Sequence, residues 1–345
     1  MEQHNSENIA FDATPYEAQI GGMTGAIRVT ATGGPEVLRW ETIEVGAPGP
    51  GQVRLAHRAI GINYIDVYHR SGLYPQPLPF IPGVEGVGVV EATGPGVHGL
   101  EPGTRVAYAL LPGSYAEGRL APADRLIALP DDIDDDVAAG LMLRGMTVEY
   151  LVERCYRVLP GEWVLWHAAA GGTGTIAMGW LKALGATVIG TAGSDEKCTT
   201  AAALGADFVI NYRTTNWVAR VKELTGGRGV DVVYDGVGRD TCLPSLDCLK
   251  PTGSLITFGN ASGAVPPIDP LTLMSKGSLH FTRPSLAHYI ASRADLEQSA
   301  ASVFDMLARG AITPTIGGRY ALADAATAHR DLEARRTQGS IVFTL

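Results

Sequence analysis

Runs of apolar residues divide the chain into two regions of different character. From Gly25 to about Arg144, short runs such as GAIRVTATG, GQVRLAHRAIGI, GVGVVEATGPG and GTRVAYAL are interrupted by glycine and proline. Short strands bounded by such residues are typical of irregular β structure. We therefore expect a β-rich domain in this first part of the chain.

Beyond Gly161 the pattern changes to apolar strands that alternate with helices. The runs WVLWHA, TVIGT, DFVINY, VDVVYDG and SLITFGN are separated by expected helices near 173–185, 195–204, 215–225 and 240–249. Alternation of this kind predicts a parallel, doubly wound sheet, so the whole chain is of the α/β class. Two more helices, near 293–309 and 323–335, precede a last strand in GSIVFTL.

Bulk properties narrow the function classes. A chain of 345 residues is long enough for about two domains, and a net charge of -9 argues against a broad surface for nucleic acid or anionic lipid. The four cysteines have no zinc-site or C-x-x-C spacing, which favours reduced thiols and a cytoplasmic location. Residues 1–24 lack the order of a signal peptide and are interpreted as a polar N-terminal extension.

The segment HAAAGGTG follows the first strand of the second region and matches a degenerate dinucleotide-binding fingerprint. Ala169 replaces the first glycine of G-x-G-x-x-G, whereas Gly171 and Gly174 occupy the other two positions. Gly171 would let the backbone approach a pyrophosphate, and Gly174 would let helix and sheet pack closely. The alternative is a glycine-rich turn in some other α/β protein, but the strand before it and the helix after it favour a nucleotide.

The end of the next strand indicates which nucleotide is bound. NAD-binding folds place a carboxylate there for the ribose 2′-hydroxyl, but this chain has Ala192, followed by Gly193, Ser194 and Lys197. The missing acid and the nearby ammonium group favour NADPH. Asp195 and Glu196 are expected only to complement the start of a helix. The alternative for Lys197 is a solvated surface lysine.

Several sequence blocks together resemble one family. The blocks GGPEVL, AIGINYIDVYHRSGLYP, HAAAGGTG, KALGATVIGT, VINYR, ITFGNASGAV, KGSLHFTRPSL and TQGS are similar to the zinc-free, ζ-crystallin-like quinone oxidoreductases of the medium-chain dehydrogenase/reductase superfamily. The resemblance runs from about Gly25 to Leu345. It implies a GroES-like β-barrel catalytic domain over 25–145 and 285–345, and an NADPH-binding Rossmann domain over 146–284.

The resemblance also implies site residues. The nicotinamide and quinone side is expected to hold Asn63, Tyr64, Asp66 and Tyr68. Contacts with the cofactor are implied for Tyr150, Gly171, Gly172, Thr173, Gly174, Phe258, Gly259, Asn260, Thr282, Arg283, Pro284 and Arg335, and the 2′-phosphate pocket for Gly193, Ser194, Lys197 and Tyr212. One departure is Gly236 in VYDGVG, where close relatives carry serine.

The zinc ligands of alcohol dehydrogenases in the same superfamily have no counterparts here. GINYIDV offers Asn63 or Tyr64 in place of the cysteine, and GVEGVG offers Val84 in place of the histidine. A metal site is therefore not expected. Without a Lewis acid, an acceptor with its own electron deficiency, such as a quinone, fits better than an alcohol.

The expected mechanism is hydride or single-electron delivery from NADPH to a quinone held in the cleft between the domains. Tyr64 and Tyr74 are candidate proton sources, or they pack the cleft without proton transfer. Asp66 would either brace the GINYIDV turn or act as an acid.

Other functions and partners stay open. One enzymatic alternative is reduction of another activated alkene, such as an enoyl thioester or an α,β-unsaturated carbonyl. A non-catalytic alternative is a crystallin or RNA-binding role. The strands SLITFGN and GSLHFT lie at the far side of the expected sheet, where an exposed edge would pair two subunits into a homodimer.

Overall fold

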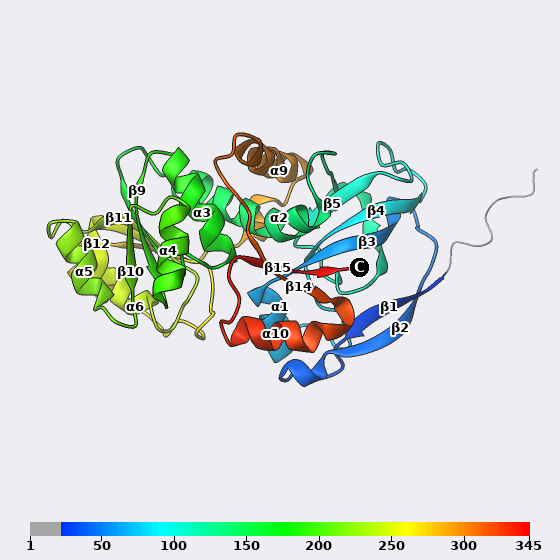
Figure 1. Cartoon of the computed structure of the whole chain (residues 1–345), viewed down its shortest axis with the longest axis horizontal. Helices are drawn as coiled ribbons and strands as arrows, with labels where there is room; N and C mark the ends of the chain where they lie inside the picture. Colours follow the sequence, from blue (N-terminus) through cyan, green and yellow to red (C-terminus); the bar gives the residue numbers. More distant parts are fainter. Residues whose placement is uncertain (1–21) are drawn as a thin grey trace, which may run out of the picture.

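The computed structural model describes residues 22–345 and shows an elongated molecule with a sheet toward each end (Figure 1). Residues 1–21 of the expected N-terminal extension lie outside the described part. Gly22, Met23 and Thr24, which the sequence interpretation assigned to that extension, instead begin strand β1 (Gly22–Arg28). No helix within residues 22–345 is long and apolar enough to cross a membrane.

One sheet has six parallel strands in the order β10-β9-β8-β11-β12-β13. The strands are β8 (Trp163–Trp166), β9 (Thr187–Ala192), β10 (Phe208–Asn211), β11 (Val230–Asp235), β12 (Leu249–Thr257) and β13 (His280–Thr282). The helices between them are α3 (Gly172–Ala183), α4 (Asp195–Ala203), α5 (Trp217–Leu224), α6 (Cys242–Ser245) and α7 (Pro270–Ser275). All six residues of β11 are buried, as expected for a strand covered on both faces. The strand order reverses between β8 and β11, where ligands bind in folds of this kind.

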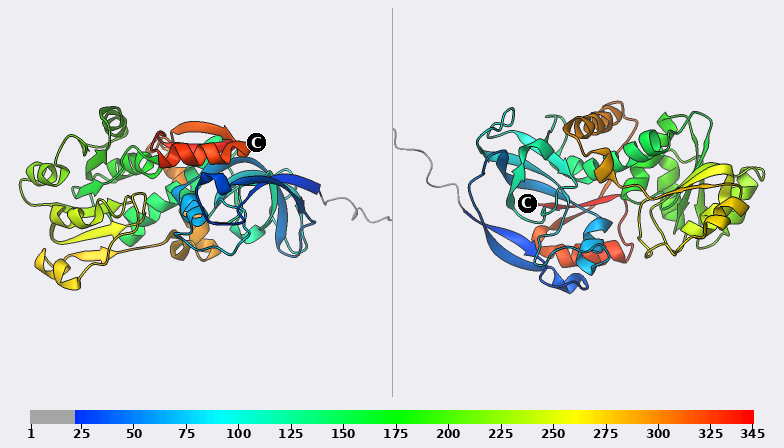
Figure 2. Two further views of the ribbon diagram at one scale, coloured as in Figure 1. Left: turned by 90° about the horizontal axis from the view of Figure 1, so that it is seen from below. Right: turned by 180° about the vertical axis from the view of Figure 1, so that it is seen from behind.

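The other sheet has seven strands and is mainly antiparallel. It consists of β3 (Gln52–Ile62), β4 (Glu85–Thr93), β5 (Arg105–Ala109), β6 (Gly118–Pro122), β7 (Ile127–Ala128), β14 (Ile316–Ala321) and β15 (Ser340–Thr344). Strands β1 and β2 (Arg39–Val45) form a separate antiparallel ribbon, and α8 (Leu286–Tyr289), α9 (Arg293–Ala308) and α10 (Ala325–Glu333) follow the parallel sheet along the chain. Two further views show β14, β15 and α10 returning to the N-terminal part of the chain (Figure 2).

Helix α2 (Asp135–Glu149) connects the two sheets and is buried along most of its length. It packs against β3 and β4 on one side and against α3 on the other. The sequence predicted only a helix start in PDDIDDD, because a helix that is apolar on all sides has no amphipathic pattern. The domain limits at 145/146 and 284/285 stay predictions.

Helix α1 (Tyr64–Ser71) occupies the segment that the sequence interpretation treated as a turn. Its β-branched and aromatic residues are typical of strands, but Asn63 caps its first turn and Gly72, with φ 83°, ends it in the left-handed region. Helices α3, α4, α5, α9 and α10 lie within a few residues of their predicted ranges. The helix predicted near 240–249 is shorter, because α6 gives way to a 3-10 turn over Leu246–Cys248.

Candidate active site

A cavity of about 770 Å³ is lined by residues from both domains. The parallel sheet contributes the carboxyl ends of β8, β9, β11 and β12, which meet at one edge of the sheet. The other domain contributes α1, α2, the last turn of α10 and the chain from there to the start of β15. Ligand pockets commonly measure about 300–1,000 Å³, so this cavity is large enough for a cofactor and a substrate together.

The turn between β8 and α3 leaves main-chain donors pointing into the cavity. Gly171 caps α3 and has no side chain to occupy the N–H groups of the first turn. A Cβ atom on Gly174 would lie 2.4 Å from the Ala168 oxygen and 2.6 Å from the Ala169 oxygen, so only glycine fits this approach of helix to strand. The free N–H groups and the helix dipole together form a site for an anion.

At one side of the cavity, cationic and hydroxyl groups gather, and no carboxylate among residues 22–345 forms an ion pair with Lys197 or Arg335. We name Gly193, Lys197, Tyr212 and Arg335 the cationic end. The ammonium group of Lys197 donates to the main-chain oxygens of Arg335, at 2.9 Å, and Thr337, at 3.4 Å. Burial lowers the pKa of Lys197, and the neighbouring Arg213 lowers it further. The Tyr212 hydroxyl lies 3.5 Å from the Arg335 guanidinium.

The two acids next to the cationic end are occupied elsewhere. Asp195 accepts from the amide of Asn211 at 2.7 Å, and Glu196 accepts from the amide of Gln338 at 2.7 Å. Ser194 caps α4 by accepting from the Lys197 main-chain N–H at 3.3 Å, and it does not line the cavity. The cap uses the Ser194 oxygen as an acceptor and leaves the hydroxyl proton free for the implied contact with a phosphate.

Aromatic side chains line a second part of the cavity, which adjoins the cationic end at Tyr64. We name Asn63, Tyr64, Tyr68, Tyr74 and Arg283 the tyrosine end. The rings of Tyr68 and Tyr74 meet edge to face, with centroids 5.1 Å apart, and Tyr64 lies 6.2 Å from Tyr68. Its tyrosines come from α1 and the loop that follows it, and Arg283 comes from the loop after β13.

Two of these tyrosines donate their hydroxyl protons in hydrogen bonds to neighbouring oxygens. Tyr64 donates to the Leu332 oxygen at 3.1 Å. Tyr74 donates to the amide oxygen of Asn260 at 3.1 Å and accepts from Arg283 at 2.9 Å. The oxygen of Tyr68 accepts from the Asn260 main-chain N–H at 2.9 Å, so its own proton is not used by that bond. Burial raises the pKa of Tyr68, which keeps it protonated.

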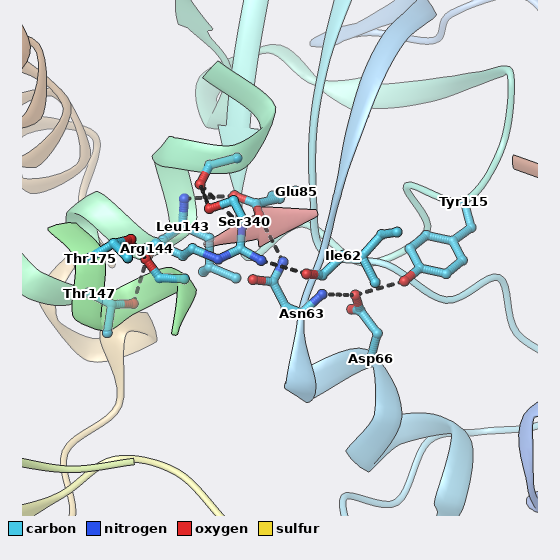
Figure 3. Close-up of polar contacts among 12 residues, drawn as sticks. Ile62, Asn63, Asp66, Glu85, Tyr115, Leu143, Arg144, Thr147, Thr175 and Ser340 are labelled. Atoms are coloured by element: carbon cyan, nitrogen blue, oxygen red, sulfur yellow. Dashed lines mark hydrogen bonds and ion pairs between the residues drawn. The ribbon is translucent and has the colours of Figure 1, made fainter. Parts of the chain in front are cut away.

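A buried ion pair lies behind the tyrosine end (Figure 3). Glu85, which is fully buried, accepts from Asn63 at 2.7 Å, from Arg144 at 3.0 Å and from the Leu143 main-chain N–H at 2.8 Å. Burial raises the pKa of Glu85, and the adjacent Arg144 guanidinium opposes that shift. Arg144 also donates to the main-chain oxygens of Gly140 and Ile62.

Asp66 braces α1 and does not line the cavity. Its carboxylate accepts from the Asn63 main-chain N–H at 2.8 Å and from the Tyr115 hydroxyl at 2.9 Å. Burial raises the pKa of Asp66 to about 7. The structure thus shows the bracing contact expected as one of two alternatives, and it places Asp66 out of reach of a substrate in the cavity.

The structure brings most of the implied site residues together around one cavity. Those that line it are Asn63, Tyr64, Tyr68, Tyr74, Tyr150, Gly171, Gly172, Thr173, Gly174, Gly193, Lys197, Tyr212, Phe258, Gly259, Arg283, Pro284 and Arg335. Four do not line it: Asp66, Ser194, Asn260 and Thr282. Asn260 still contacts the site by hydrogen bonds to Tyr68 and Tyr74, whereas Thr282 ends strand β13.

Sequence reasoning missed much of the cavity wall, including Arg144, Leu332 and Thr337. Arg144 belongs to α2, Leu332 belongs to the last turn of α10, and Thr337 lies between α10 and β15. The signal for Arg144 was available, because a charged residue inside the apolar run LMLRGM is seldom buried unless it is paired. Leu332 carries no such signal, whereas Thr337 lies in the TQGS block of the family resemblance.

The described residues offer no ready-made metal site. Within residues 22–345 no group of three or more His, Cys, Asp or Glu side chains could hold a metal ion. Asn63 and Tyr64 stand at the start of α1, and Val84 precedes β4.

Known families match both parts of the chain. Residues 49–131 match the alcohol dehydrogenase GroES-like domain, and residues 172–306 match the zinc-binding dehydrogenase family. A quinone oxidoreductase from Pseudomonas aeruginosa is 48% identical over 323 residues, covering 93% of this chain and 99% of the relative. A 2-haloacrylate reductase from a Burkholderia species is 46% identical over 330 residues, again covering 93% of this chain and 99% of the relative.

A solved structure of similar sequence has the same architecture. The Escherichia coli quinone oxidoreductase complexed with NADPH aligns with a TM-score of 0.91 at 45% identity, and it covers 93% of this chain and 100% of that one. The GroES-like and Rossmann expectations for the fold are therefore confirmed.

Proposed function

The chain belongs to the quinone oxidoreductase family of the medium-chain dehydrogenase/reductase superfamily, and on this premise we propose that it reduces quinones with NADPH. The cationic end is the observation that carries the proposal. Lys197 and Arg335 converge there beside Tyr212, and the nearby acids are engaged elsewhere. An extra phosphate on the adenosine ribose explains why such a site lacks the carboxylate of NAD-binding folds.

The residues present fit NADPH along the cavity. The first-turn N–H groups of α3 suit the pyrophosphate. Within the described part of the chain, the ammonium group of Lys197 donates only to uncharged main-chain oxygens, and a phosphate would be a stronger acceptor for it. When bound, NADPH supplies the hydride that a quinone accepts together with a proton.

The tyrosine end supplies the remaining chemistry. Tyr68 holds a proton that its bond with Asn260 leaves free, and it would donate that proton to the acceptor oxygen. Arg283 lies at the same end, and its bonds go to the neutral oxygens of Gly259, Thr257 and Tyr74. Its charge would stabilise the oxygen that becomes negative during reduction. We therefore assign the proton-donor role to Tyr68 in place of Tyr64 and Tyr74.

Reduction of an activated alkene is the second candidate. The similarity to a 2-haloacrylate reductase is comparable to that with the quinone oxidoreductases. Arg283 is also a suitable partner for a substrate carboxylate, because it makes no ion pair with a carboxylate among the described residues. The same hydride donor and the same proton source would serve both reactions.

Binding and turnover measurements test the proposal. Calorimetry should show NADPH bound at least tenfold more tightly than NADH, which corresponds to about 1.4 kcal/mol. NADPH oxidation should then be faster, by kcat/KM, with 1,4-benzoquinone than with 2-chloroacrylate. Equal affinity for the two coenzymes would overturn the proposal, faster reduction of 2-chloroacrylate would favour the second candidate, and NADPH binding without any turnover would favour a non-catalytic role.

We also propose that the protein is a cytoplasmic homodimer. Strand β13 is the last strand of the parallel sheet, and its outer edge is available to a second copy. All four cysteines are free, as in a reducing compartment. Solution scattering should give twice the mass of one chain, and a monomeric mass would rule out the dimer.

A further inference from the structure

The Glu85 carboxylate determines which atom of Asn63 faces the cavity. A carboxylate can only accept hydrogen bonds, and Glu85 lies 2.7 Å from the Asn63 side-chain nitrogen. The amide group must therefore point its NH₂ toward Glu85. Figure 3 shows the amide oxygen of Asn63 on the other side, directed away from Glu85.

Arg144 keeps Glu85 in this accepting state. Its guanidinium lies 3.0 Å from the same carboxylate oxygen that Asn63 contacts, and it favours the charged form of Glu85. The second carboxylate oxygen is held by the Leu143 main-chain N–H at 2.8 Å. Because both oxygens have fixed donors, the carboxylate cannot rotate to release the Asn63 amide.

The same ion pair also packs against the dinucleotide turn. A Cβ atom on Gly172 would lie 2.5 Å from the Nε atom of Arg144. Gly172 begins α3, so the guanidinium stem rests directly beneath the turn that we propose for the pyrophosphate. Glu85 and Arg144 therefore fix Asn63 and the coenzyme turn relative to one another, although the two come from different domains.

We propose that Glu85 is a positioning residue that holds the Asn63 oxygen toward the cavity as a hydrogen-bond acceptor for the carboxamide N–H of the nicotinamide. This inference rests on the proposed function, because it requires the coenzyme in the cavity. Glu85 itself contacts neither coenzyme nor substrate, and it acts only through Asn63 and Arg144. An acceptor at this point selects a coenzyme that can donate there.

The test compares NADP⁺ with its 3-acetylpyridine analogue, in which a methyl ketone replaces the carboxamide and no N–H remains. Affinities are measured by calorimetry, so the readout does not depend on turnover. The unaltered protein should bind NADP⁺ roughly three- to tenfold more tightly than the analogue, the range expected for one lost hydrogen bond. The adenosine, pyrophosphate and 2′-phosphate contacts are common to both ligands and cancel in the ratio.

The substitution Glu85→Gln should abolish this preference. The Leu143 N–H is fixed in the main chain of α2 and requires the amide oxygen of the new side chain. The Asn63 amide can turn, and Arg144, which donates to the same oxygen as Asn63, keeps its bonds to the Gly140 and Ile62 oxygens, so the new NH₂ should face Asn63. The Asn63 amide would then turn its oxygen toward that NH₂ and present its own NH₂ to the cavity. We expect the ratio of the two dissociation constants to fall below about twofold.

A second variant and a matched control distinguish loss of positioning from a general folding defect. Asn63→Ser keeps a good cap for α1 and should lose the preference by itself. Combining it with Glu85→Gln should then change the ratio no further, because both act on the same atom. Asp231→Asn is the control: Asp231 is also a buried carboxylate that accepts from one main-chain N–H and two cationic side chains, but it does not line the cavity.

The possible outcomes separate this inference from the proposed function. A preference retained in Glu85→Gln or in Asn63→Ser, or lost in Asp231→Asn, would overturn the positioning role even though NADPH binds. No preference in the unaltered protein would overturn it as well. Failure of the unaltered protein to bind NADP⁺ at all would instead contradict the proposed function.

Discussion

The two ends of the cavity are built in opposite ways. At the cationic end the side chains reach solvent, and Tyr212 is 37% exposed. Lys197 and Arg335 are tied there only to neutral partners. At the tyrosine end Asn63 is 8% exposed, and its partner Glu85 is fully buried in an ion pair.

This difference suits the cationic end to binding the coenzyme, and the buried groups at the tyrosine end to holding side chains in position. Exposed cations can release main-chain oxygens and take up a phosphate at little cost to the fold, so they serve recognition. Buried groups with fixed partners cannot rearrange without breaking hydrogen bonds in the interior. We therefore expect changes at the buried Asn63 and Glu85 to alter stability, and changes at the cationic end to alter binding alone.

The largest expected effect is that of Glu85→Ala on stability. Loss of the Glu85 carboxylate leaves the Arg144 guanidinium buried with main-chain oxygens as its partners. Removal of one partner of a buried ion pair costs about 4 kcal/mol of stability. Denaturant unfolding should show this decrease in the free energy of unfolding. Glu297→Ala, which removes an exposed pair with Arg293, should cost less than about 0.5 kcal/mol. If the two variants lost similar free energies of unfolding, the buried ion pair would not be more important for stability than the exposed one.

Asp66 should make the tyrosine end sensitive to pH. Burial raises its pKa from 3.8 to about 7 in the folded protein. Below a pH of 3.8 the Asp66 carboxyl is protonated in both the folded and the unfolded protein, so its ionisation costs the folded state no free energy. As pH rises toward neutrality the unfolded chain loses this proton first, so the folded state is destabilised, by about 4 kcal/mol once the pH exceeds the folded pKa.

The variant Asp66→Asn isolates this effect from the buried histidines, which titrate with the opposite sign. Burial lowers the pKa of His57 and His167 to about 4, so those groups stabilise the fold as pH rises. We expect the variant to gain stability relative to the unaltered protein between about pH 5 and about pH 8 in urea unfolding. A constant difference between the two proteins across this range would show that Asp66 is ionised throughout.

Lys197→Ala should weaken NADPH binding and leave stability unchanged. A hydrogen bond between charged groups contributes about 2 kcal/mol, which corresponds to roughly a thirtyfold higher Kd for NADPH. The Kd for NADH should change less than threefold, because NADH lacks the 2′-phosphate. Calorimetry measures both values, and Lys222→Ala on the exposed side of α5 serves as the control. An equal loss for the two coenzymes would remove Lys197 from phosphate recognition.

Local sequence pattern predicted part of the cationic end, whereas Arg335 was implied only by the family resemblance. Ala192, Gly193 and Lys197 lie within one strand–turn–helix unit, so local pattern was enough to place them together. The parallel sheet was predicted for a similar reason, because strands buried on both faces are continuous apolar runs.

The partners at the tyrosine end are distant in sequence. Arg144 meets Glu85 from 59 positions away, and Leu332 meets Tyr64 from 268 positions away. No local pattern encodes such contacts, so the sequence identified the tyrosines but not the acceptors of their protons. Helix α1 was missed because its capping bonds, and not its residue propensities, determine its conformation.

The smallest expected effect is that of Tyr64→Phe, and it tests the assignment of the proton source. The Tyr64 hydroxyl donates to the Leu332 oxygen, so its removal should cost about 1 kcal/mol of stability or less and change kcat less than threefold. Tyr68→Phe removes the proton that no neighbour within residues 22–345 accepts, and kcat should fall about a hundredfold while the Kd for NADPH stays within a fewfold. The pair is matched because both residues lie on α1 and lose one hydroxyl. A larger loss of kcat in Tyr64→Phe than in Tyr68→Phe would mean that the Leu332 bond breaks during turnover and that Tyr64 supplies the proton.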